Sequence, residues 1–132
     1  MNTDRVQTEG PKYPEADLSE RILGAAFKVH NTLGVGFLEK VYENALAHEL
    51  RTEKIAVEQQ KPIRVMYDGI VAGEYQADLV VDNRVLVECK AASNLDPVHD
   101  AQLLNYLRAT GIRVGLLLNF GRAKLQYRRL VM

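Results

Sequence analysis

A β-hairpin in the middle of the chain restricts the possible folds more than any other part of the sequence. Residues 74–81 and 84–91 are rich in Val and Leu, and only the turn-forming pair Asp82-Asn83 separates them. Strands joined this tightly must lie side by side and run antiparallel. The chain is therefore expected to contain a β-sheet in which these two strands are neighbours.

The register of this hairpin decides which charged side chains meet. Side chains alternate between the two faces of a strand, so Glu88 and Lys90 share a face. A three-residue loop would pair Val81 with Val85 and put Asp78 opposite Glu88 on that face. A two-residue loop would put the two carboxylates on opposite faces, because a slip of one residue reverses every side chain. We predict the three-residue register.

Asp78, Glu88 and Lys90 are the residues on which we expect chemistry to depend. Two carboxylates one strand apart repel each other unless a cation lies between them or one is protonated. Oxygen ligands suit Mg²⁺ or Mn²⁺, and the backbone carbonyl of Cys89 could add a third ligand while its thiol points into the core. Lys90 would then orient or deprotonate a water that attacks a phosphate. The alternative is a surface cluster of salt bridges with little energetic value.

The rest of the chain alternates between helical and strand periodicity. Apolar residues recur at helical spacing over residues 17–33, where Asp17 and Glu20 form an expected capping box. Residues 55–67 predict a strand that is interrupted near Pro62. The expected order is α-α-β-β-β-α-β-β, with further helices at residues 38–53 and 97–110 and further strands at residues 113–119 and 124–131. This order predicts an α/β fold with a mixed sheet of four or five strands flanked by helices.

The length of 132 residues indicates one domain, expected over residues 17–132. Residues 1–16 contain Gly10, Pro11 and Pro14 without an apolar period, so we expect a flexible tail. No segment has the roughly 20 apolar residues of a membrane-spanning helix, and the N-terminus lacks the apolar core of a secretory signal. The single cysteine excludes an internal disulfide and a Cys-rich zinc site, and it predicts a reducing, cytoplasmic location.

The charge balance excludes one class of nucleic-acid-binding protein. The 17 basic and 17 acidic residues cancel, which argues against a protein that coats nucleic acid non-specifically. The charges are unevenly spread, because residues 108–132 hold six basic residues and no acidic one. This segment could form a basic edge beside an acidic site, or simply a solvated pair of strands.

The second expected helix carries acids on its core-facing stripe. Glu39, Glu43, Leu46 and Leu50 are spaced by three or four residues and therefore share one face. A carboxylate at the edge of a core costs free energy unless it is paired or metal-bound, which makes both acids candidates for the site. The alternative is that the stripe runs out to solvent at its N-terminal end, where acids favour the helix dipole. Tyr42 would either cover the site or fill the core.

The third expected helix carries a polar stripe with an aromatic residue. His99, Gln102 and Tyr106 are spaced by three and four residues, so they share one face. This stripe could support Lys90 or contact a phosphate backbone, and His99 near the helix start could bind phosphate. The plain alternative is a hydrated helix face.

Three motifs resemble those of known protein families. Asp78 followed by Glu88-x-Lys90 is similar to the D…(D/E)xK signature of the PD-(D/E)XK nuclease superfamily. Residues 36–42 read G-x-x-E-x-x-Y, and with most of the chain they resemble the GxxExxY protein family. Residues 102–106 resemble the Q-x-x-x-Y helix motif of RecB-like nucleases.

The resemblance implies a restriction-endonuclease-like core and a Mg²⁺-dependent nuclease that acts on DNA more than on RNA. It implies that Asp78 and Glu88 hold the metal ion, that Glu39 assists, and that Lys90 is the catalytic lysine. Gln102 would support the lysine or the phosphate. The competing hypothesis is a non-catalytic module that binds nucleic acid or protein with the same fold. A homodimer would let two sites address both strands of a duplex, and no membrane partner is expected.

Overall fold

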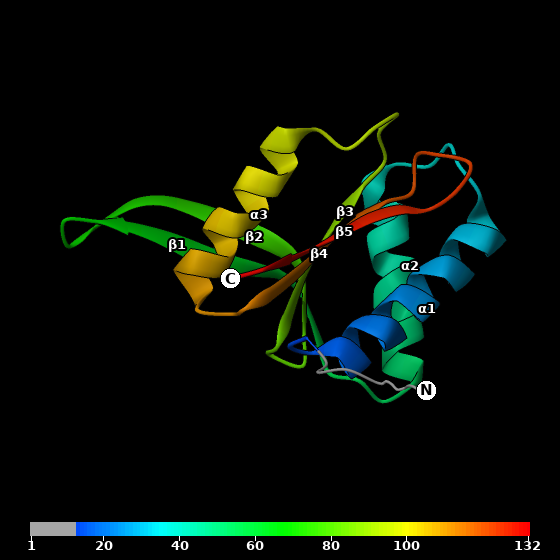
Figure 1. Cartoon of the computed structure of the whole chain (residues 1–132), viewed down its shortest axis with the longest axis horizontal. Coiled ribbons are helices and arrows are strands. Elements are labelled where there is room, and N and C mark those ends of the chain that lie inside the picture. Colours follow the sequence, from blue (N-terminus) through cyan, green and yellow to red (C-terminus); the bar gives the residue numbers. More distant parts are fainter. Residues whose placement is uncertain (1–12) are drawn as a thin grey trace, which may run out of the picture.

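Five strands form one mixed sheet that helices cover on both faces (Figure 1). The computed structural model describes residues 13–132. Its elements are, in chain order, α1 (Ala16–Leu33), α2 (Glu39–Thr52), β1 (Val57–Tyr67), β2 (Ile70–Val81), β3 (Val85–Lys90), α3 (Pro97–Thr110), β4 (Val114–Asn119) and β5 (Gln126–Val131). The strand order is β1-β2-β3-β4-β5; the β3–β4 pair is parallel and the other neighbouring pairs are antiparallel. The predicted α/β class and order of elements are confirmed.

Two apolar cores lie on opposite faces of this sheet. Helices α1 and α2 pack on one face, where Ile22 and Leu46 are buried in the same cluster as Val87. Helix α3 covers the other face, where Leu103 is buried in the same cluster as Leu86. Figure 1 shows α1 and α2 together on one side of the strands and α3 on the other. Leu86 and Val87 are sequence neighbours that enter different cores, as strand alternation requires.

The β2–β3 hairpin has the predicted register. Val81 pairs with Val85, and Leu79 pairs with Val87, so residues 82–84 form the loop. Asp82 and Asn83 have φ values of 53° and 55°, a left-handed conformation that Asp and Asn tolerate better than most residues. The register brings Asp78 and Glu88 to the same end of the hairpin.

Helix α3 connects the parallel strands β3 and β4, and it has the predicted bounds. The Asp96 side chain accepts a hydrogen bond from Val98 N at 2.9 Å, while His99 Nδ1 accepts one from Asp96 N at 3.1 Å. Pro97 occupies the first turn, where its missing N–H costs nothing. Gly111 ends the helix with a φ of 75°.

Strand β1 departs from the prediction, because it is not interrupted at Pro62. This residue pairs with Gln76 inside the ladder, which β1 tolerates as an edge strand. The irregularity falls instead at Gln60, which has a φ of 54° and no partner in the ladder. The register itself is unchanged across Gln60 and shifts between Val65 and Met66.

The predicted capping box at Asp17 and Glu20 is wrong. Helix α1 begins at Ala16, so Asp17 lies within its first turn, and the capping position is Glu15. Of the expected tail over residues 1–16, residues 1–12 lie outside the described part of the chain, and Ala16 belongs to the helix. No helix among residues 13–132 combines the length and apolar character needed to cross a membrane.

The contact between α3 and β4 generates a stability prediction. A Cβ at Gly115 would lie 2.8 Å from Leu103 Cδ2 and 2.9 Å from its Cγ, because α3 packs directly on this backbone. We expect Gly115→Ala to lower the free energy of unfolding by about 1–3 kcal/mol, measured by urea denaturation, because it overpacks the core. Gly24→Ala in α1 is the matched control, since nothing lies within 4 Å of a Cβ there. Equal effects of the two substitutions would contradict this packing.

Candidate active site

Asp78 and Glu88 lie where the β2–β3 ladder ends, at the last pair Leu79–Val87. Beyond that pair, each carboxylate bonds the backbone of the opposite strand. Asp78 N donates to Glu88 Oε2 at 2.8 Å, and Cys89 N donates to Asp78 Oδ2 at 2.8 Å. Side chains thus replace the backbone bonds of the ladder, and this exchange fixes the orientation of both carboxylates.

A third acid, Glu43 of α2, joins the pair through Gln60. Its side chain is buried, with 3% exposure. Gln60 Nε2 donates to Glu43 Oε1 at 2.8 Å and to Asp78 Oδ1 at 3.3 Å. Lys40 Nζ lies 3.2 Å from Glu43 Oε2 and partly balances its charge. Gln60 is not paired in the β1–β2 ladder, and its side chain instead links Glu43 of α2 to Asp78 of β2.

Burial and mutual repulsion control the protonation of these acids. Burial raises the pKa of Glu88 to about 8, with a further contribution from the negative charge of Asp78. The pKa of Asp78 is also raised, mainly by burial, and the hydrogen bond from Cys89 N opposes this rise. The positive charge of Lys90 lowers the pKa of both carboxyl groups. The pair therefore favours a bound proton or a bound cation.

Lys90 and Cys89 occupy opposite faces at the end of β3. The thiol of Cys89 is fully buried among the residues packed against α1 and α2, and burial raises its pKa well above the usual value. A neutral, enclosed thiol is a poor nucleophile. Lys90 is only partly buried, and within residues 13–132 its Nζ makes no ion pair shorter than 4 Å. Its charge is therefore available to a substrate or an attacking water.

A cleft of about 500 Å³ opens beside Asp78. Its lining includes Glu39, Lys40, Glu43, Gln60, Asp78 and Ala91, together with Phe37 and Leu38. Glu39 is exposed on its rim, as the alternative of a stripe running out to solvent predicts. Glu43 is the acid that the hydrogen bonds connect to Asp78, so it lies closer to the carboxylate pair than sequence spacing alone indicated.

The residues of α3 divide between the site and the helix cap. Gln102 hydrogen-bonds the side chain of Tyr106, and the negative charge of Glu88 adds to the rise that burial causes in the pKa of Tyr106. Tyr106 is therefore close enough to Glu88 to interact with it electrostatically, and Gln102 is linked to the site through Tyr106. His99 uses Nδ1 to cap its own helix. Its expected role in phosphate binding stays a prediction.

Tyr42 supports the wall of the cleft from inside the core. Its hydroxyl donates to Gly34 O at 2.6 Å and accepts from Phe37 N at 3.2 Å. Its ring stacks on Phe120 with centroids 4.7 Å apart. The side chain is fully buried, so Tyr42 fills the core and at the same time fixes the loop that leads into Glu39.

Asn119 and Gly121 hold the chain that follows Lys90. Asn119 Oδ1 accepts from Ala92 N, and Asn119 Nδ2 donates to Ala92 O, both at 2.9 Å. A Cβ at Gly121 would lie 2.5 Å from the Ala92 backbone, so only glycine allows this approach. Sequence reasoning assigned no role to Asn119, Gly121 or Gln60. A possible signal for Gln60 was the polar pair Gln59-Gln60 within an otherwise alternating strand.

Three of the C-terminal basic residues, Arg122, Arg128 and Arg129, have side-chain partners within the protein. Arg128 Nη1 lies 2.5 Å from Asp100 Oδ2. The guanidinium of Arg129 lies 3.7 Å from the centre of the Tyr13 ring. Arg122 bonds the side chain of Asn94. These three residues are thus engaged in intramolecular contacts, which limits what they could add to a basic edge.

The oxygen donors of this site fit a hard divalent cation. Asp78, Glu88 and the Cys89 carbonyl supply oxygen atoms, the donor type that Mg²⁺ and Mn²⁺ prefer. The raised pKa values of the two carboxyl groups fit the same conclusion, because a cation would relieve their repulsion. Within residues 13–132, no three Asp, Glu, His or Cys side chains are already arranged as a metal cluster.

The raised pKa of Glu88 predicts that metal-free protein loses stability as pH rises. Between its usual value of 4.5 and about 8, the folded state holds a proton that the unfolded state has released. We expect the melting temperature to fall from about pH 5 to about pH 9 in EDTA, and Glu88→Gln to flatten this dependence. Glu58→Gln, on the exposed edge of the sheet, is the control and should leave the slope unchanged. A slope that survives in Glu88→Gln would show that another group carries it.

The hydroxyl of Tyr42 generates a second stability prediction. Tyr42→Phe keeps the stacking on Phe120 and removes both hydroxyl hydrogen bonds. We expect a loss of about 1–3 kcal/mol in the free energy of unfolding, because buried backbone groups lose their partner. Tyr127→Phe removes an exposed hydroxyl and should change stability by less than about 0.5 kcal/mol. Urea denaturation of both variants makes the comparison.

Two solved structures have a fold similar to that of this protein. Solved structures with a similar fold include the crystal structure of SSO0001, with a TM-score of 0.54 and 16% identity over 89% of this chain and 58% of that one. They also include the alkaline exonuclease LHK-Exo from Laribacter hongkongensis, with a TM-score of 0.52 and 13% identity over 96% of this chain and 72% of that one.

This chain spans little more than half the length of SSO0001. No curated protein matches its sequence. The profile of the PD-(D/E)XK nuclease superfamily matches residues 16–130, which include every strand and helix up to Leu130 of β5. The chain belongs to the PD-(D/E)XK nuclease superfamily.

Proposed function

We propose that this protein is a Mg²⁺- or Mn²⁺-dependent nuclease that hydrolyses phosphodiester bonds in nucleic acid, with DNA preferred over RNA. One observation carries the proposal: Asp78 and Glu88 exchange backbone hydrogen bonds where their strands separate, with Lys90 next to both. Superfamily membership supports the choice of substrate class. The preference for DNA rests on the resemblance alone.

Asp78, Glu88 and the Cys89 carbonyl would hold the metal ion, with Glu39 as a further acid on the rim of the cleft. When bound, the ion polarises a phosphoryl oxygen and lowers the pKa of a water molecule. Glu43 and Gln60 hold Asp78 in place from the side of α2. This support keeps one carboxylate oriented before any ligand arrives.

Lys90 would orient the attacking water and stabilise negative charge on the phosphate. Its partly buried position beside two acids keeps its ammonium close to the reacting groups. Gln102 would act as a positioning residue through Tyr106, which lies near Glu88. A cytoplasmic location and a homodimer are further expectations, based on the single buried cysteine and on the need to address two strands.

Cleavage of supercoiled plasmid and of single-stranded circular DNA, with Mg²⁺ or Mn²⁺, tests the proposal. We expect Asp78→Asn and Lys90→Ala to reduce the rate by at least about 100-fold, the effect of removing a group that serves proton transfer or ion binding. Lys61→Ala on the exposed side of β1 is the matched control and should retain the wild-type rate. Equal rates in wild type and both site variants would rule out this catalytic site.

A non-catalytic binding module is the second candidate function. It is favoured by the absence, within residues 13–132, of three metal-binding side chains already clustered. Calorimetric titration with Mn²⁺ separates the two functions. The nuclease requires binding that Glu88→Gln weakens, whereas the module requires no divalent binding and salt-sensitive association with nucleic acid.

A further inference from the structure

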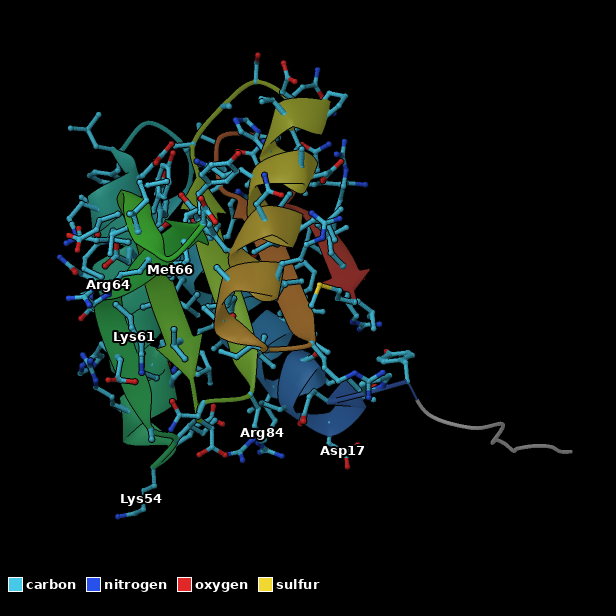
Figure 2. All side chains as sticks on the ribbon, turned by 90° about the vertical axis from the view of Figure 1, so that its left-hand side faces the viewer. Asp17, Lys54, Lys61, Arg64, Met66 and Arg84 are labelled. Atoms are coloured by element: carbon cyan, nitrogen blue, oxygen red, sulfur yellow. The ribbon has the colours of Figure 1, made fainter. Side chains whose placement is uncertain are left out.

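The β1–β2 hairpin extends beyond the other strands and forms a groove with α3. Figure 1 shows the hairpin running out past the ends of β3 and β4, with α3 alongside. The groove has a volume of about 880 Å³. Figure 2 shows Arg64 and Met66 on the β1 side of this region. Of the residues described for the nuclease site, Gln102 and Tyr106 also line this groove.

The lining of the groove combines apolar, aromatic and basic side chains. Met66 and Tyr75 of the hairpin are 56% and 49% exposed, so both present apolar surface to the groove. Arg64 and Arg108 add positive charge from either side, and the lining contains no carboxylate. Arg64 pairs with Glu74 at 3.4 Å, but both side chains are more than 60% exposed. Such an ion pair is weak, so a phosphate can compete for Arg64.

The groove lies on the face of the sheet to which Glu88 belongs, because Tyr106 is buried in the same cluster as Leu86 and Glu88 follows Leu86 on that face of β3. Tyr75 on the hairpin contacts Tyr106 on α3, with ring centroids 5.7 Å apart. Tyr106 and its partner Gln102 both line the groove, and Tyr106 lies within the electrostatic reach of Glu88. A chain lying in the groove would therefore run along the same face of the sheet as Glu88.

We propose that this groove binds single-stranded nucleic acid and directs it into the active site. Bases would stack on Tyr75 while Arg64 and Arg108 contact phosphates, the combination typical of single-strand binding. The inference rests on the proposed nuclease function and adds the strandedness of its substrate.

The geometry of the tyrosines explains the choice of single strands. Two rings that sandwich a base must be about 7 Å apart, twice the stacking distance of about 3.4 Å. Tyr75 and Tyr106 are closer than that, so a base stacks on the exposed face of Tyr75 and not between them. A duplex keeps its base faces stacked inside and offers Tyr75 only its backbone. The ring therefore contributes affinity only when bases are unpaired.

Fluorescence anisotropy with a labelled oligothymidylate of about 12 nucleotides, in EDTA, tests this binding without cleavage. We expect Tyr75→Leu to weaken binding about 10-fold, because it keeps an apolar side chain and removes the stacking surface. Arg108→Gln should reduce the slope of log K against log salt by about 0.7, the value for one phosphate contact on a single strand. Neither variant should change the melting temperature appreciably, since both side chains are exposed.

Two controls match these variants in chemistry and exposure. Tyr127 is 45% exposed on β5 and also contacts one aromatic ring, so Tyr127→Leu removes an equivalent ring outside the groove. Arg21→Gln removes an exposed charge from α1. Both controls should bind the oligonucleotide within about twofold of wild type, and a duplex of equal length should bind Tyr75→Leu as it binds wild type.

The outcomes separate the groove from the nuclease function. Binding that Tyr75→Leu leaves unchanged, or weakens equally for duplex, overturns the groove proposal even if the protein cleaves DNA. Stacking-dependent binding by a protein that cleaves nothing overturns the nuclease function and leaves the groove. A wild-type dimer in sedimentation that Tyr75→Leu dissociates would assign the groove to contact between two copies, and it too would overturn the proposal.

Discussion

The separation of β2 from β3 at Asp78 is the constraint on which the site depends. Paired strands satisfy their backbone groups with each other, so two strands that diverge must find other partners for them. Here the partners are the carboxylates of Asp78 and Glu88 themselves. The hydrogen bonds that end the ladder also hold two carboxyl groups together, although burial and mutual repulsion oppose charge on both. Fold and site thus share the same bonds, and neither carboxylate can be removed without freeing a buried backbone N–H.

Several residues around this site act on the backbone and not on a substrate. Tyr42 fixes the loop before α2, and Asn119 fixes the chain after Lys90. The parallel pairing of β3 and β4 makes the second contact possible, because it brings Lys90 and Asn119 to the same edge of the sheet. Tyr42, the tyrosine of the G-x-x-E-x-x-Y pattern, therefore has a structural role in packing and hydrogen bonding. Glu39, the glutamate of the pattern, lies on the rim of the cleft.

The sequence allowed prediction of what depends on local periodicity. The order of elements, the bounds of α3 and the register of the β2–β3 hairpin follow from side-chain alternation, caps and loop length. The bridge through Gln60 could not be predicted, because it depends on a left-handed residue that breaks a strand and on the distance between α2 and β2. The predicted start of α1 was also wrong, because acidic residues are favoured both at a helix cap and in the first turn. The spacing of Asp17 and Glu20 therefore did not decide between the two positions. Periodicity identifies faces, but it does not determine which faces meet.

The register shift between Val65 and Met66 has a mechanical consequence. Beyond this point the hairpin has only its own two strands, and its residues up to Glu74 are mostly exposed. A two-stranded hairpin that is fixed at one end bends most easily where its ladder is irregular. We therefore expect thermal motion to tilt the part of the hairpin beyond this register shift. This motion would change the width of the groove between the hairpin and α3, while the end of β2 that carries Asp78 stays in place. The outer end of β2 would therefore move, while its other end, which carries Asp78, would stay rigid.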